Sequence, residues 1–135
     1  MRVVIDTNVM VSGILNPHGP PGRIIDALLS EIITALHDDR VLSEYREVLL
    51  RPAFGFARPD VEALLAFMES AGEHINARPL ALVLPDPNDL PFLEVATSGH
   101  ADALITGNSK HFKPSRGKHD VTVISPAAFL RATAG

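Results

Sequence analysis

Residues 2–9 read Arg-Val-Val-Ile-Asp-Thr-Asn-Val, and this segment sets the expectation for the whole fold. Three of its first four residues are β-branched, which is typical of a buried strand. The polar residues Asp6, Thr7 and Asn8 follow at once and are typical of a helix N-terminus. We therefore predict a strand over Arg2–Ile5 that leads directly into a helix over Val9–Leu15.

The rest of the chain alternates short apolar segments with stretches of helical periodicity. Further strands are expected over Ile32–Leu36, Ala103–Thr106 and Val121–Ile124, with another bounded apolar run at Leu80–Leu84. Further helices are expected after a loop at residues 16–22, over Arg23–Ser30, from Asp38 or Asp39 to Leu50, from Pro59 to Gly72, over Asn88–Ser98 and at the C-terminal end. Strands joined by helical crossovers imply a parallel sheet with helices on both faces. The predicted fold class is therefore α/β, a three-layer α/β/α arrangement in one domain spanning residues 1–135.

The composition excludes several classes of protein. A hydrophobic fraction of 46% with 21% charged residues is typical of a folded soluble protein. No apolar run approaches the roughly 20 residues of a membrane-spanning helix, and the N-terminus lacks a secretory signal, so we expect no membrane association and a cytoplasmic protein. Because the chain has no cysteine, any metal ion must be held by carboxylates, amides or histidines, which favours a hard ion.

Asp6 lies at the predicted carboxyl end of the first strand. In open parallel sheets the functional crevice lies at the carboxyl ends of the strands, so Asp6 is a candidate site residue. The alternative is that Asp6 or Asn8 only caps the following helix.

Glu44 lies at the border of an apolar helical stripe formed by Val41, Leu42, Tyr45, Val48 and Leu49. At about 100° per residue, Glu47 points away from this stripe to solvent, whereas Glu44 could line a cleft. The alternative is a surface acid near Arg40 or Arg51.

Asp89 falls in the middle of an apolar helix face that includes Phe92, Leu93 and Ala96. A buried unpaired charge costs several kcal/mol, so Asp89 must cap its helix, pair with a cation or bind a metal ion. Asp86 is either a second crevice carboxylate or a turn former, and we favour the turn.

Asn108 follows the strand that ends in Thr106 and should reach the same crevice. Asp102 precedes that strand and should lie at its opposite end, roughly 13 Å or more away, so we interpret it as structural. Carboxylates that converge on one crevice repel one another unless a cation neutralises them, and oxygen ligands suit Mg²⁺ or Mn²⁺. Such an ion can activate water for attack on a phosphodiester.

Four segments together resemble the PIN-domain family, in its prokaryotic toxin type. They are Val-Ile-Asp-Thr-Asn-Val at 4–9, Ser-Glu-Tyr-Arg-Glu-Val-Leu at 43–49, Asp-Pro-Asn-Asp-Leu-Pro-Phe-Leu-Glu-Val-Ala at 86–96 and Ala-Asp-Ala-Leu-Ile-Thr-Gly-Asn at 101–108. The resemblance extends over nearly the whole chain. It implies that Asp6, Glu44 and Asp89 are the family's acidic residues, with Thr7 and Asn8 supporting Asp6. We add Asp86 and Thr106 as further supporting candidates.

The resemblance also implies a Mg²⁺- or Mn²⁺-dependent endoribonuclease acting on single-stranded RNA, often a homodimer and often the toxin neutralised by an antitoxin protein. Asn108 departs from the family pattern, because many members have aspartate there. The side chain keeps an oxygen that can orient water or substrate but removes one charge.

Acidic and basic residues are separated along the chain, whose net charge is −4. All three lysines lie in the segment Lys110–His119. Lys110, His111, Lys113 and Arg116 could bind phosphates beside the metal ion, with a solvated surface loop as the alternative. Among the aromatic residues, Phe54, Phe56 and Phe112 could stack on bases, although core packing is the more common role.

Two other functions compete with catalysis. The chain could be a catalytically lapsed PIN-like module that binds RNA or protein, which Asn108 would favour. A haloacid-dehalogenase-like phosphohydrolase needs a second aspartate two residues after Asp6, and position 8 is asparagine. No glycine-rich phosphate loop or dinucleotide motif follows any predicted strand.

Overall fold

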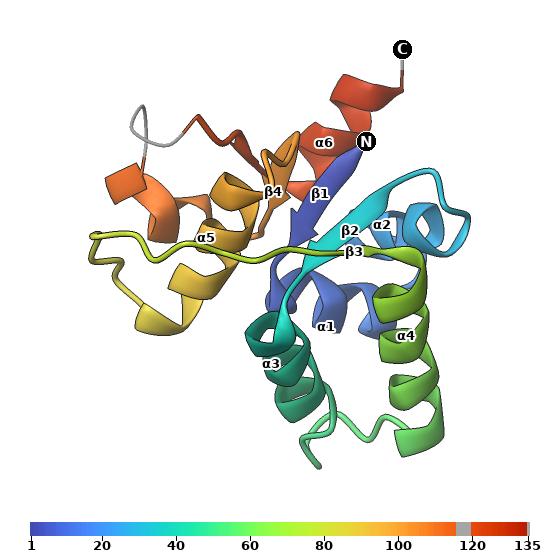
Figure 1. The fold of residues 1–135 in the computed structure, drawn as a ribbon. Coiled ribbons are helices and arrows are strands. Elements are labelled where there is room, and N and C mark those ends of the chain that lie inside the picture. The colour runs from blue at the N-terminus through green and yellow to red at the C-terminus, as the bar shows by residue number, and fades with distance from the viewer. Residues whose placement is uncertain (116–119, 135) are drawn as a thin grey trace.

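The computed structural model describes residues 1–115 and 120–134, and its centre is a parallel sheet of five strands in the order β3-β2-β1-β4-β5 (Figure 1). The strands are β1 Arg2–Ile5, β2 Thr34–His37, β3 Glu73–His74, β4 Ala103–Ile105 and β5 Val123–Ile124. Every pair of neighbouring strands is parallel. The predicted α/β class with a parallel sheet is thus confirmed.

The strand β1 lies in the middle of the sheet, as its apolar sequence predicts. Val3, Val4 and Ile5 are fully buried. In the sheet register, Val3 pairs with Ala35 of β2, and Ile5 pairs with Ile105 of β4. The carboxyl ends of β1 and β4 are therefore adjacent, which brings the residues after each strand to one edge.

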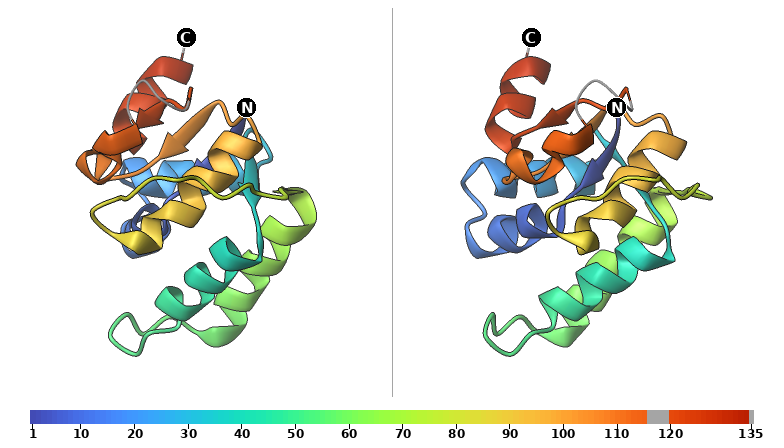
Figure 2. Two further views of the ribbon diagram at one scale, coloured as in Figure 1. Left: turned by 60° about the vertical axis from the view of Figure 1, so that its left-hand side comes forward. Right: turned by 90° about the vertical axis from the view of Figure 1, so that its left-hand side faces the viewer.

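Six α-helices surround the sheet in the described part of the chain. They are α1 Thr7–Leu15, α2 Pro20–Leu29, α3 Asp39–Leu49, α4 Arg58–Ala71, α5 Leu90–Ser98 and α6 Pro126–Thr133. Two 3₁₀ helices, η1 Pro87–Asp89 and η2 Ser109–Ser115, precede α5 and follow β4. The helix α5 packs on β1, β2 and β4, whereas α2 packs on α1 and α6. The helices α3 and α4 lie side by side and extend away from the sheet (Figure 2).

Several boundaries differ from the sequence prediction. The helix α2 begins at Pro20, inside the segment expected as a loop, because prolines at the first helical positions need no hydrogen-bond donor. The strand β2 covers Thr34–His37 rather than Ile32–Leu36. The edge strand β3 was not predicted, because its two residues are exposed and polar and show no apolar alternation.

The segment Leu80–Leu84 does not form a strand. It belongs to an extended connection that crosses α5 (Figure 1), and the backbone N–H of Leu80 donates to Glu94 at 2.8 Å. This bond joins the start of the segment to a side chain of α5 rather than to a neighbouring strand. None of the helices that the structure describes is long and apolar enough to cross a membrane.

Candidate active site

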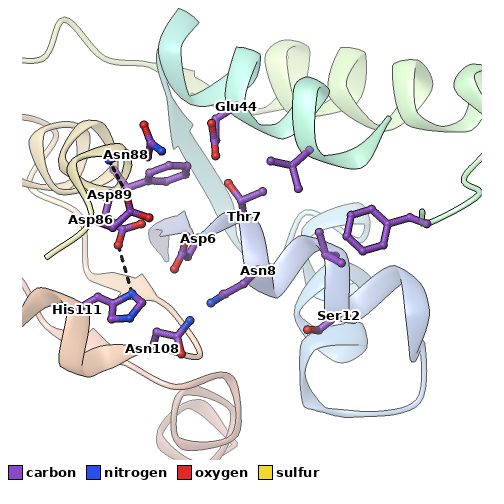
Figure 3. Close-up of a pocket in the computed structure, with 14 residues that line it drawn as sticks. Asp6, Thr7, Asn8, Ser12, Glu44, Asp86, Asn88, Asp89, Asn108 and His111 are labelled. Carbon is purple, nitrogen blue, oxygen red and sulfur yellow. Dashed lines mark hydrogen bonds and ion pairs between the residues drawn. The ribbon is translucent and has the colours of Figure 1, made fainter. Parts of the chain in front are cut away.

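A pocket of about 330 Å³ lies where the carboxyl ends of β1 and β4 meet the start of α5 (Figure 3). Its polar lining comes from α1, α3, the segment around η1, and the start of η2. These side chains are Asp6, Thr7, Asn8, Ser12, Glu44, Asp86, Asn88, Asp89, Asn108 and His111. A second hollow shares Asn8, Ser12 and Asn108 with it and continues toward the start of α6. The pocket is therefore the inner end of a longer depression.

Asp6 is held at the end of β1 by the neighbouring strand. It is 6% exposed, and its Oδ2 accepts a hydrogen bond from the Thr106 hydroxyl at 2.6 Å. The Asp6 side chain makes no capping hydrogen bond to α1, so the structure does not support the capping alternative. Burial raises the pKa of Asp6, and the hydrogen bond from Thr106 only partly offsets this. Asp6 is thus a buried carboxylate fixed in place by a structural partner.

Asn8 connects α1 to the loop after β4. Its Oδ1 accepts from the backbone N–H of Gly107 at 3.4 Å. Asn108 lies on the other side of that loop and lines the pocket, and its backbone N–H donates to the Thr106 hydroxyl at 3.0 Å. The two asparagines and Thr106 therefore fix the loop that borders Asp6.

Glu44 reaches the pocket because α3 is anchored to the end of β1. Tyr45 is fully buried, and its hydroxyl donates to the backbone carbonyl of Ile5. The predicted apolar stripe of α3 is buried, so Glu44 lies at its border, facing the pocket. Glu47 lies on the exposed face of α3, as predicted, and pairs there with Arg51 at 3.1 Å. Burial and neighbouring carboxylates raise the pKa of Glu44.

Asp86 combines both of the roles considered from the sequence. Its Oδ1 accepts from the backbone N–H of Asn88 at 2.9 Å, which is the predicted turn. It also lines the pocket, and its charge raises the pKa of Asp6, Glu44 and Asp89. The preference for a turn former alone was therefore incomplete, because turn formation uses one carboxylate oxygen and leaves the charge in the pocket.

Asp89 is the carboxylate with the most perturbed environment in the pocket. Its side chain is 13% exposed, and its Oδ2 lies 3.5 Å from His111 Nδ1 without a hydrogen-bond partner among the described residues (Figure 3). Burial, followed by the charges of Asp6 and Asp86, raises the pKa of Asp89 to about 6. Such a group favours either a proton or a bound cation.

The family model of the PIN domain matches residues 2–110 of this chain. The chain belongs to the PIN-domain family. An uncharacterized protein of Methanocaldococcus jannaschii is 34% identical over 112 residues, which cover 80% of this chain and 71% of that protein. The region matched by the family model includes all the acidic positions of the pocket, from Asp6 to Asp89.

A solved structure shares the fold of this PIN domain. It is the crystal structure of VapBC2 from Rickettsia felis bound to a DNA fragment from their promoter. The comparison gives a TM-score of 0.58 and 20% identity and covers 93% of this chain and 98% of that chain. At this identity the similarity establishes the arrangement of strands and helices.

Proteins of the PIN-domain family are typically nucleases and are generally metal-dependent. The pocket of this PIN domain fits a hard divalent cation, because its carboxylates raise one another's pKa and two buried oxygens, Asp89 Oδ2 and Thr7 Oγ1, lack hydrogen-bond partners in the described structure. Among residues 1–115 and 120–134, no group of three or more acidic or histidine side chains is already spaced as a metal-ligand set. The pocket is an open acidic cleft rather than a closed coordination shell.

Of the predicted phosphate-binding residues that the structure describes, only one lines the pocket. His111 lines the pocket beside Asp89, whereas Lys110 and Lys113 are exposed on η2 and do not line it. Arg116 lies outside the described residues. The segment thus contributes one side chain to the pocket and two cations to the adjacent surface.

Sequence reasoning did not identify Ser12 and Asn88, which also line the pocket. Ser12 lies four residues after Asn8, so both share one face of α1, and this spacing was a usable signal. Asn88 had no signal of this kind, because its position depends on the turn at η1.

Asp89 is expected to contribute stability to the metal-free PIN domain that increases as the pH falls from about 7.5 to about 4.5. The pKa of Asp89 is about 6 in the folded state, against roughly 4 in an unfolded chain, so the folded state binds the proton more tightly. This contribution to stability is complete below about pH 4 and is lost as the pH rises through 6. Raised pKa values of Asp6 and Glu44 act in the same direction.

Urea unfolding in EDTA measures this effect as the difference between the wild type and Asp89→Asn. At about pH 7.5 we expect the variant to be more stable by roughly 1 to 2 kcal/mol, and at about pH 4.5 the difference should shrink. The paired comparison is needed because burial lowers the pKa of His37, which favours unfolding at low pH in both proteins. A stability difference between the two proteins that grows toward low pH would contradict the raised pKa of Asp89.

Proposed function

We propose that this chain is a metal-dependent endoribonuclease that hydrolyses phosphodiester bonds of single-stranded RNA. One observation carries the proposal. In a chain of a nuclease family, Asp6, Glu44 and Asp89 line one pocket at the carboxyl end of the central strand, and a buried oxygen of Asp89 has no hydrogen-bond partner among the described residues. Carboxylates that converge on one pocket repel one another unless a cation neutralises them.

In this proposal Asp6, Glu44 and Asp89 hold Mg²⁺ or Mn²⁺. When bound, the ion would lower the pKa of a water molecule and stabilise charge on the phosphate oxygens. Thr106 keeps the Asp6 carboxylate in one orientation through its hydrogen bond. His111 places a ring nitrogen beside Asp89 and, when protonated, adds a positive charge at the edge of the cleft.

The remaining polar residues position the RNA. The amide of Asn108 borders Asp6 and can donate to or accept from a phosphate or water without adding charge. Lys110 and Lys113 are exposed next to the pocket and can bind flanking phosphates, since phosphate contacts dominate affinity for nucleic acids. The hollow that continues toward α6 gives space for a strand longer than one nucleotide.

The competing proposal is a lapsed module that binds RNA or a protein without cleaving it. Asn108 supports it, because one acidic position of the family pattern is neutral. The convergence of Asp6, Glu44 and Asp89 on one pocket opposes it, since a binding module has no evident need for several carboxylates at one point.

The test is incubation of the purified chain with a mixed-sequence single-stranded RNA, the same RNA annealed to its complement, and DNA of the same sequence. We expect internal cleavage of the single-stranded RNA with Mg²⁺ or Mn²⁺, and little cleavage of the duplex. Binding of the RNA without cleavage in either metal would favour the lapsed module.

We further propose that the chain is the toxin of a toxin-antitoxin pair, acting as a homodimer and neutralised by an antitoxin protein. The fold shared with the VapBC2 structure supports the toxin-antitoxin part of this proposal. Induced expression in a bacterial host should arrest growth, and Asp6→Asn should abolish the arrest. Light scattering of the purified chain should give twice the chain mass of 14.5 kDa. Normal growth of a host that expresses the active wild type would contradict the role as a toxin. The mass of a monomer in light scattering would contradict the homodimer.

A further inference from the structure

The pocket is lined by apolar as well as acidic side chains. The apolar lining consists of Val11, Val48, Phe54 and Phe92. Phe92 is 2% exposed and belongs to the core, whereas Phe54 is only partly buried. Phe54 is therefore the aromatic ring of this lining that a ligand can contact.

Phe54 lies in the connection between α3 and α4, and one face of its ring is covered by another aromatic ring. Its ring stacks on that of Phe56, with centroids 5.5 Å apart and an angle of 14° between the ring planes. Phe54 lines the acidic pocket, whereas Phe56 lines a separate apolar groove against α4. The stack thus presents Phe54 to the pocket on a second ring that packs against the protein.

The other aromatic side chains considered in the sequence do not offer such a surface. Phe112 is 1% exposed and is part of the core, and Tyr45 is fully buried against Phe92. The expectation that core packing is the more common role therefore holds fully for Phe112, whereas Phe54 and Phe56 pack against the core while staying partly exposed.

We propose that Phe54 is a base-stacking platform, on which an unpaired base of the RNA stacks while an adjacent phosphate lies beside the acidic side chains of the pocket. A nucleotide combines the same two kinds of surface as the pocket, with a charged phosphate and a flat, weakly polar base. A base can stack on an aromatic side chain only where it is unpaired and not stacked between the neighbouring bases of its own strand. This inference rests on the proposed ribonuclease function and adds the reason why single strands are the substrate.

The chain allows a direct test, because it contains no tryptophan and its one tyrosine is buried. Phe54→Trp introduces a single strong fluorophore at the proposed platform, in a Glu44→Gln background that slows cleavage. A short single-stranded RNA in Mg²⁺ should quench this fluorescence in a saturable way, and the same RNA with abasic sites should not. The matched control is Phe67→Trp on α4, which lies in the apolar groove outside the acidic pocket.

Equal quenching by normal and abasic RNA, or equal quenching of the tryptophans at positions 54 and 67, would overturn the proposal. This readout does not depend on catalysis. If the wild type fails to cleave RNA but the tryptophan at position 54 is selectively quenched, the stacking inference stands and the proposed nuclease function fails.

Steady-state kinetics separates a stacking role from a structural one. Phe54→Leu keeps an apolar side chain but removes the π face, and we expect KM to rise by about five- to hundredfold with a smaller change in kcat. Phe54→Tyr should restore KM to within about threefold, because it keeps the ring. If RNA is cleaved and Phe54→Leu has wild-type KM with unchanged urea stability, the platform is excluded while the nuclease function stands.

Discussion

Replacing Asp6 by asparagine is expected to lower the rate of RNA cleavage by roughly 10²- to 10⁴-fold, because it removes a proposed metal ligand of nearly the same size. The substitution should not destabilise the folded state. The pKa of Asp6 is raised by burial, so its charge destabilises the metal-free folded state, and asparagine can still accept the hydrogen bond from Thr106. We therefore expect the free energy of unfolding in EDTA at neutral pH to stay equal or to increase.

The measurement pairs initial cleavage rates with urea unfolding curves for the same protein preparations. Asp26→Asn is the matched control, because Asp26 is exposed on α2 and does not line the pocket. The control should retain full activity. An Asp6→Asn variant that cleaves RNA at the wild-type rate, or that loses activity only because it unfolds, would remove Asp6 from the proposed chemistry.

The second large effect is expected at Glu94, which joins three segments next to the pocket. Its side chain is 6% exposed and accepts from Arg40 at 2.7 Å and from the backbone N–H of Leu80 at 2.8 Å. Arg40 in turn pairs with Asp38, whose Oδ1 caps α3 at Val41. The network thus ties α3, α5 and the extended connection that leads to the acidic turn at η1.

Glu94→Ala should lower the free energy of unfolding by about 2 to 3 kcal/mol. The variant leaves the N–H of Leu80 without its acceptor and opens a small cavity, whereas the half-exposed Arg40 is returned to solvent at little cost. Glu94→Gln keeps an acceptor and should lose only about 1 kcal/mol. Urea unfolding at neutral pH measures both, and equal stability of the alanine variant and the wild type would show that the network contributes nothing.

The strands next to the site were predictable because their apolar runs are followed by polar residues. Val3–Ile5 and the run that ends at Thr106 are buried in the structure as expected, and parallel pairing then places Asp6 beside the loop at Asn108. The stripe of α3 also identified Glu44 rather than Glu47 as the carboxylate at the border of a cleft. These predictions need only local periodicity and the geometry of a parallel sheet.

Contacts between distant segments were not predictable in this way. Asp89 was expected to need a partner, but the proximity of His111 depends on how η2 folds back over the sheet edge. Glu94 lies on a helix with buried residues on several faces, and its partner Arg40 comes from another helix. A single sequence does not contain the tertiary distances that pair such residues.

The phenylalanines show the same limit. Phe54, Phe56 and Phe112 all appear in loop-like sequence, and nothing local distinguishes the buried ring from the pair that stacks beside the pocket. In the structure Phe112 is 1% exposed, whereas Phe54 and Phe56 are partly buried. It becomes visible only in the assembled fold.

The most direct test of the central claim is a metal titration of RNA cleavage by the wild-type chain after treatment with EDTA. Cleavage of single-stranded RNA should be absent in EDTA, return in a saturable manner with Mg²⁺ or Mn²⁺, and fail to return for Asp89→Asn at the same ion concentrations. Cleavage by the wild type that persists in EDTA, or that is restored equally in Asp89→Asn, would contradict the assignment of this pocket as a metal-dependent nuclease site.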